Sequence, residues 1–181
     1  MECIDDFAYL GSVQSEDAGS AAGVARRMEI TAGGMRNLRN IWFSQRMKIA
    51  TKVRIYQLCV MTILLHCSET WTLTNACCSR LQSFHMWYQR QLMGVRWNDF
   101  VTSDFISSIT GLDNVSTIIR ARRLALLGHV ARLDHVVQSV VGVLPSPGYR
   151  RPLGRARHTW VNHIKEDIAA PLDSVIHLAA D

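Results

Sequence analysis

Long hydrophobic runs are absent from this chain of 181 residues. The longest predominantly apolar run, LCVMTILL at residues 58–65, falls well short of the roughly 20 residues that a helix needs to cross a bilayer. Residues 1–15 have neither the positive start nor the apolar stretch of a secretory signal peptide. The sequence therefore predicts no membrane partner and an intracellular location.

Paired cysteines are also lacking. The five cysteines are an odd number in no disulfide spacing, which is typical of a reducing compartment. Cys67, Cys77, Cys78 and His85 do not form the two close pairs that are usual in a structural zinc site. No cysteine lies in a local sequence context that would mark it as an activated nucleophile. We therefore predict buried free thiols, no metal, no cofactor and no catalytic cysteine.

Lysine is scarce, with 3 residues against 17 arginines, and the net charge is +5. Residues 26–54 hold eight basic side chains against Glu29 alone, and residues 120–165 hold nine against Asp134 alone. A solubilising surface more often uses Lys and Glu, whereas the planar fork of arginine suits phosphate. These segregated charges indicate RNA, DNA or an RNA–DNA hybrid as the first partner to consider.

Apolar residues recur at spacings of three and four, and 48% of the chain is hydrophobic. This pattern predicts a mainly α fold with a real core. The predicted helices span 45–66, 76–93 up to Gly94, Thr102 or Ser103 to Gly111, 116–133 and about 160–168, after a weaker helical period over 24–43 that breaks at Gly33 and Gly34. Ser44 is the predicted N-cap of the helix over 45–66.

Four of the predicted helices have an inward stripe. The predicted inward residues are Ile49, Val53, Tyr56, Val60 and Ile63; Leu81, Phe84, Tyr88 and Leu92; Ile119, Leu126, Val130 and Leu133; and Trp160, Ile164 and Ile168. Lys48 and Lys52 are predicted on an exposed face. The tryptophans could stack on bases, but beside Leu and Ile at helical spacing they are more often core.

Two basic segments have competing interpretations. The helix RARRLALLGHVARLDH at 120–135 is either a solvated surface helix or one that grips phosphate. The loop PSPGYRRPLGRAR at 145–157 holds three prolines, two glycines and four arginines, which forbid regular structure and add positive charge. Nothing in either segment resembles a helix that reads bases, so phosphate contact without sequence preference is the functional interpretation.

The chain begins with adjacent carboxylates, Asp5 and Asp6, before the strand-like segment FAYLGS. A paired Asp before a strand is how nucleotidyl transferases hold two metals, but a third carboxylate from another strand and a facing cation are also needed. Neither is evident, so an acidic turn is the favoured interpretation.

Several segments together resemble one family, the C-terminal part of reverse transcriptases from LINE-type (non-LTR) retrotransposons. The similar segments, in family order, are FAYLGS at 7–12, TKVRIYQLCVMTILLHCSETWTL at 51–73, RLQSFHMWYQRQLMGVRWND at 80–99, IRARRLALLGHVARLD at 119–134 and GRARHTWVNHIKEDI at 154–168. The chain departs from the family pattern at Ala8, His66, Cys67, Ala156 and Asn162, which suits a truncated, decaying element copy.

The resemblance implies a palm and primer-grip remnant over 1–18, thumb-like helices over 19–75 and a basic helical extension over 76–181. The fold class is therefore mainly α, a helical thumb-like bundle plus that extension, with a short N-terminal β-hairpin or strand remnant of the polymerase palm. In the family the metal-binding aspartates precede the primer grip by many tens of residues. Asp5 and Asp6 are then not catalytic, and the fingers and most of the palm would lie upstream of Met1.

The functional expectation is a fragment of an RNA-directed DNA polymerase that lacks catalytic residues, is no enzyme as it stands and retains nucleic-acid binding. The resemblance also implies a nuclear location and the missing palm and fingers as partners. A non-catalytic interaction module without binding is the alternative. The candidate nucleic-acid-binding residues are Tyr9, Leu10, Gly11, Lys48, Lys52, Arg120, Arg122, Arg123, Arg132, Arg150, Arg151, Arg155 and Arg157.

Overall fold

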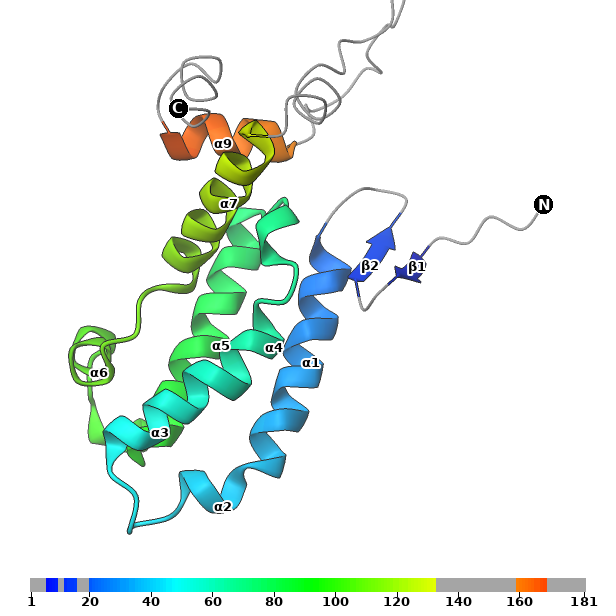
Figure 1. Cartoon of the computed structure of the whole chain (residues 1–181). Helices are drawn as coiled ribbons and strands as arrows, with labels where there is room; N and C mark the ends of the chain where they lie inside the picture. The colour runs from blue at the N-terminus through cyan, green and yellow to red at the C-terminus, as the bar shows by residue number, and fades with distance from the viewer. Residues whose placement is uncertain (1–5, 10–11, 16–19, 133–158, 169–181) are drawn as a thin grey trace, which may run out of the picture. The chain divides into compact units, whose positions relative to one another are not determined.

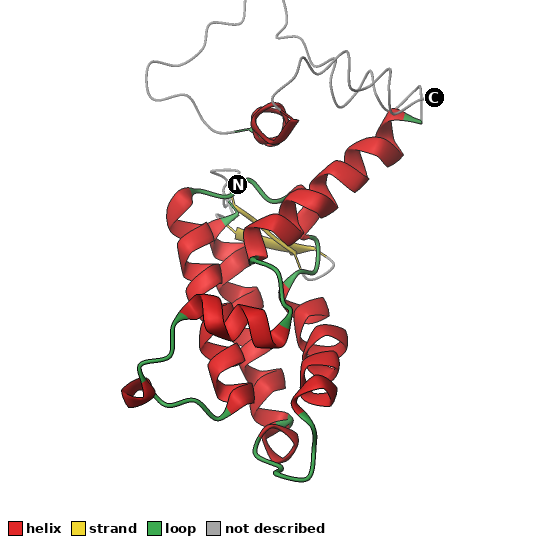
Figure 2. Ribbon diagram, turned by 90° about the vertical axis from the view of Figure 1, so that its left-hand side faces the viewer, coloured by secondary structure: helices red, strands yellow, loops and turns green. Residues whose placement is uncertain are grey.

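The computed structural model describes residues 6–9, 12–15, 20–132 and 159–168, and these are mainly helical, as predicted (Figure 2). The chain divides into two compact units. Unit 1 comprises Met1–Ser68 and Leu73–Ile118, and unit 2 comprises Glu69–Thr72 and Ile119–Asp181. None of the helices in the described ranges is long and apolar enough to cross a membrane.

Unit 1 begins with two short strands, β1 (Asp6–Tyr9) and β2 (Ser12–Ser15). They pair antiparallel, with Asp6 opposite Ser15 and Tyr9 opposite Ser12. Strand β2 lies beside the first helix, α1 (Ala21–Asn37) (Figure 1). Leu10 and Gly11, between the strands, lie outside the described residues.

Helix α1 runs through Gly33 and Gly34 without the predicted break. A Cβ added at Gly34 would lie 3.5 Å from Cδ1 of Ile63, which is ordinary van der Waals contact. Alanine would therefore also fit at this position. The helix continues because a helical glycine is only roughly 1 kcal/mol less favourable than alanine, and Val24, Thr31 and Met35 hold α1 in the core.

The predicted helix over 45–66 consists of three consecutive parts: α3 (Ile49–Ile55), the π-helical segment η1 (Tyr56–Met61) and α4 (Thr62–Leu64). Its inward stripe is confirmed at Val53, Tyr56 and Val60, which are buried, whereas the predicted Ile49 and Ile63 are half-buried. Its start was predicted wrongly. The N-cap is Lys48 and not Ser44, because the short helix α2 (Arg39–Trp42) and an irregular segment precede it.

Helices α5 (Asn75–Met93) and α6 (Ser103–Thr110) confirm their predicted bounds within a residue. The Thr74 hydroxyl accepts a hydrogen bond from the Cys77 N–H, and the Thr102 hydroxyl accepts one from the Phe105 N–H. Both helices end at a left-handed glycine, Gly94 or Gly111. The buried face of α5 includes the predicted Leu81, Tyr88 and Leu92, while Phe84 is half-buried. The turns η2 (Ser68–Thr70) and η3 (Trp97–Asp99) flank α5.

The two threonine caps give a first prediction. Replacing Thr74 or Thr102 by alanine should lower the free energy of unfolding by about 1 kcal/mol, because an N-terminal N–H of the helix loses its acceptor. Urea titration followed by circular dichroism measures the change. Thr→Ser at the same positions keeps the hydroxyl and is the control; equal losses for Ala and Ser would contradict this role of the hydroxyl.

Unit 2 contains most of α7 (Val115–Ala131) and all of α9 (Trp160–Ile168). The predicted stripe of α9 is confirmed, because Ile164 is buried with Leu127 of α7 and the partly buried Trp160 and Ile168 pack against them. The inward face of α7 differs from the prediction. Its buried positions repeat every four residues at Ile119, Arg123, Leu127 and Ala131.

The predicted inward residues Leu126 and Val130 are only half-buried, and Leu133 lies outside the described residues. The true stripe was missed because one of its members is an arginine. A charged residue at a core position breaks the apolar period that identifies a buried face.

Candidate nucleic-acid interface

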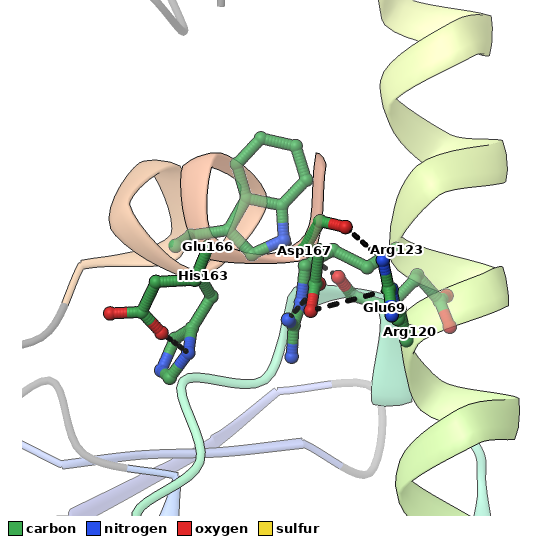
Figure 3. A network of polar contacts seen from close by, with 7 residues as sticks. Glu69, Arg120, Arg123, His163, Glu166 and Asp167 are labelled. Atoms are coloured by element: carbon green, nitrogen blue, oxygen red, sulfur yellow. Dashed lines mark hydrogen bonds and ion pairs between the residues drawn. The ribbon is translucent and has the colours of Figure 1, made fainter. Parts of the chain in front are cut away.

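The arginines predicted to grip phosphate on α7 are in part held by a carboxylate of α9 (Figure 3). Arg123 is only 5% exposed, and its Nη1 lies 2.5 Å from Oδ2 of Asp167. Arg120 donates a hydrogen bond to the Asp167 main-chain carbonyl, and its Nε lies 3.8 Å from Oδ1 of the same residue. Arg123 therefore stabilises the packing of α7 against α9 and is not presented on a solvated face.

The other predicted residues of this helix, Arg122 and Arg132, are half-buried and exposed respectively. Arg150, Arg151, Arg155 and Arg157 lie outside the described residues. Among the described residues, Arg120 and Arg123 are thus brought together at a carboxylate, that of Asp167.

Two further polar contacts belong to α9. The indole Nε1 of Trp160 donates to the main-chain carbonyl of Glu69 at 2.7 Å. His163 Nδ1 lies 3.6 Å from the Glu166 carboxylate, one turn along the helix (Figure 3). Trp160 is therefore a structural residue.

Sequence reasoning missed Asp167 as a partner of the arginines, although a signal was present. Asp167 follows Ile164 by three residues and so falls on the apolar stripe of its helix, as Arg123 falls on the stripe of α7. Opposite charges at core positions of two amphipathic helices indicate a buried ion pair between them.

Four exposed cations of unit 1 lie close together in the sequence, between the end of α1 and the start of α3, and Arg26, Arg54, Arg80 and Arg96 are exposed elsewhere in the unit. No Asp or Glu stands between Glu29 and Glu69 in the sequence. The segment 36–52 forms the end of α1, α2 and the start of α3, which lie together in Figure 1. We call its four exposed cations the basic end: Arg36, Arg39, Arg46 and Lys48. None of the four forms an ion pair within the described part of the chain.

Lys52, predicted on the same exposed face as Lys48, has a structural partner instead. It is half-buried, and its Nζ donates to the main-chain carbonyl of Trp42 at 2.7 Å. This bond satisfies a carbonyl at the end of α2. Of the predicted pair, only Lys48 is fully exposed. Tyr9, the described member of the predicted primer grip, lies at the end of β1.

The tryptophans divide between core and surface. Trp42 and Trp71 are 2% and 5% exposed, as predicted for core residues. Trp87 is different, because 58% of it is exposed on α5. The side chain of Trp97 lies outside the described part of the structure.

His85, weighed above as a zinc ligand, is a buried core residue. Its Nδ1 shares a hydrogen bond of 2.9 Å with the Tyr56 hydroxyl, and the two rings stack with centroids 5.7 Å apart. Burial lowers the pKa of His85 to about 4, which the Asp113 backbone opposes in part, and burial raises the pKa of Tyr56. His85 is therefore neutral near pH 7. The described residues contain no group of three His, Cys, Asp or Glu able to hold a metal. The predicted burial of the thiols is wrong for the described cysteines, because Cys59 is exposed and Cys67, Cys77 and Cys78 are half-buried.

Comparison with known proteins gives one distant relative. A transposon-derived protein of Caenorhabditis elegans, itself uncharacterized, is 22% identical over 174 residues. The alignment covers 93% of this chain and 62% of that protein, so the chain spans about three fifths of the relative's length. No family model matches the sequence. No solved structure matches it either.

Proposed function

We propose that the chain is a degenerate product of a non-LTR retrotransposon, drawn from the C-terminal part of its reverse transcriptase, and that it binds nucleic acid without polymerising it. The distant similarity to a transposon-derived protein supports an element origin. The reverse-transcriptase assignment rests on the similar segments, from FAYLGS to GRARHTWVNHIKEDI, which follow one another in family order. In this proposal β1 and β2, with Tyr9, Leu10 and Gly11, are the primer-grip remnant. Residues 19–75 are the thumb-like helices and residues 76–181 the basic extension, as the resemblance to the family implies.

The observation that carries the binding proposal is the basic end of unit 1. Its four cations are exposed at the end of α1, on α2 and in the irregular segment up to the N-cap of α3, and the sequence around them has no acid to neutralise them. Arginine forks bind phosphate oxygens in a bidentate manner, and Lys48 adds a point charge. Phosphate contact of this kind fixes a duplex against the protein without reading its sequence. The arginines of 150–157 are a second candidate set in the same proposal.

A salt titration tests this proposal. Binding of a duplex or an RNA–DNA hybrid, followed by fluorescence anisotropy, should weaken steeply with salt because each neutralised phosphate releases counterions. Four to six contacts on duplex DNA give a log-log slope of roughly −4 to −5. Replacing Arg36, Arg39, Arg46 and Lys48 together by alanine should flatten the slope by about 3 to 4.

A second variant removes the same charge from the other candidate set. Arg150, Arg151, Arg155 and Arg157 changed together to alanine lower the net charge equally, so long-range attraction falls equally in both variants. The basic-end variant should lose the larger part of the slope. A slope that neither variant changes, or no binding at low salt, would refute nucleic-acid binding.

The alternative function is a helical interaction module, and one observation favours it. Phe105 and Ile109, one turn apart on α6, are 53% and 44% exposed, and Phe100 before the helix is 87% exposed. Exposed apolar side chains of this kind occur at protein interfaces. Both functions are non-catalytic, so purified protein with primer-template, magnesium or manganese and nucleotides should not extend the primer.

A further inference from the structure

A groove lies at the same end of unit 1 as the basic end. Two segments far apart in sequence line it, residues 42–45 on one side and Trp87 with residues 90–96 on the other, together with Lys52, and its volume is about 750 Å³. Within the described residues, the charged side chains along it are all cations: Lys52, Arg90 and Arg96. The groove is therefore electrostatically suited to an anionic ligand.

Two large aromatic side chains line this groove and remain exposed. Phe43 is 56% exposed and Trp87 is 58% exposed, although both lie beside a formed core. Each ring is supported on one side. Trp87 packs edge-on against Tyr88 with centroids 4.6 Å apart, and the Arg39 guanidinium lies over Phe43, 5.4 Å from its centroid. Supported aromatic faces next to cations are how proteins bind single-stranded nucleic acid.

The surroundings of the groove are fixed by hydrogen bonds. Trp42 is buried in its wall, where its Nε1 donates to the main-chain carbonyl of Met35 at 2.9 Å. The Arg90 guanidinium donates to Ser103 Oγ at 3.1 Å, which holds the cation in place beside Trp87. The groove thus needs little reorganisation to accept a planar ligand, which lowers the entropy lost on binding.

We infer that this groove binds unpaired nucleobases of a single strand, which stack on Trp87 and Phe43 while the strand's phosphates contact Arg96 and Arg39. The inference rests on the proposed nucleic-acid binding and extends it, because duplex phosphates need no aromatic surface whereas extruded or unpaired bases do. Single-stranded RNA and DNA share this chemistry, since every base has a π face. No base preference follows from stacking alone.

The test compares two ligands of equal charge. A short fluorescent oligothymidylate and an abasic strand of the same length carry the same phosphates, so their affinity ratio isolates the contribution of the bases. The full chain should bind oligothymidylate about tenfold more tightly than the abasic strand, as expected for stacking of at least one base. Trp87→Ala should reduce the ratio to nearly one, whereas Trp87→Phe should retain most of it. Phe43→Leu should lower the ratio in the same direction.

Phe105→Leu is the matched control, because Phe105 is a similarly exposed aromatic that does not line the groove. It should leave the ratio unchanged. Circular dichroism shows whether each variant folds, and the exposure of Phe43 and Trp87 makes unfolding by these changes unexpected. Equal affinity for the two ligands, or an unchanged ratio in Trp87→Ala, would overturn the stacking groove while leaving phosphate binding intact. If the natural chain showed no salt-dependent binding of duplex, the proposed function itself would be refuted.

Discussion

Asp167→Ala should destabilise unit 2 by about 3–5 kcal/mol, because it leaves a buried charge without its partner. Arg123 is 5% exposed and has its carboxylate partner at 2.5 Å. Without that carboxylate the guanidinium must stay buried and uncompensated or move into water and open the packing of α7 against α9. Hydrogen exchange of the α7 amides measures this locally, and protection should fall by two or more orders of magnitude.

Two controls show whether the loss of stability in Asp167→Ala comes from the unpaired charge of Arg123. Glu166→Gln removes a carboxylate from the adjacent, exposed position of α9 and should change stability by no more than about 0.5 kcal/mol. The double variant Arg123→Met with Asp167→Leu replaces both charges by apolar groups of similar size and should recover most of the stability. A double variant as unstable as Asp167→Ala would show that the ion pair itself is irreplaceable, contrary to this account.

The free energy of unfolding should also fall by about 3 kcal/mol between pH 6.5 and pH 4 through His85 alone. The pKa of His85 is lowered from 6.5 to about 4 by burial. Above pH 6.5 the imidazole is neutral in the folded and the unfolded chain, so its titration does not change the free energy of unfolding. Below that pH the unfolded chain binds a proton that the folded protein takes up only near pH 4, so acid favours unfolding.

A double variant separates the contribution of His85 to this pH dependence from the contributions of the other histidines and of the carboxylates. His85→Leu with Tyr56→Phe removes both side chains of the buried hydrogen bond, so neither of these two side chains is left without its partner. Its stability, measured by urea titration, should depend less on pH than that of the natural chain, with the difference growing from pH 6.5 downward. Parallel curves for the two proteins would contradict the depressed pKa.

The helix ends that could be predicted from the sequence depend on local chemistry. Thr74 and Thr102 are N-caps and Gly94 and Gly111 adopt left-handed conformations, because such residues satisfy the first N–H groups or terminate a helix whatever surrounds them. The stripe of α5 was predictable for a similar reason, since no charged residue interrupts it, and Trp160, Ile164 and Ile168 were enough to identify that of α9 although Asp167 lies beside them.

The features that sequence reasoning missed depend on tertiary contacts. The uninterrupted course of α1 through Gly34 depends on the burial of its face at Val24, Thr31 and Met35, and the inward position of Arg123 depends on Asp167, 44 residues away. The groove beside Trp87 was also hidden. Its two sides come from residues 42–45 and from Trp87 with residues 90–96, and the spacing of Trp87 in α5 is that of an ordinary core tryptophan.

The π-helical segment η1 is a place where this helix can lose one residue without changing the direction in which its flanking parts face. A π turn closes its hydrogen bonds over five residues where an α turn needs four, so Tyr56–Met61 holds one residue more than an α-helix would. Deleting one of the exposed residues 57–59 converts the segment to α geometry and keeps α3 and α4 in phase. The same deletion inside α5 would rotate everything after it by about 100° and turn its buried face toward solvent. Length variation among related chains is therefore expected at η1 and not within α5.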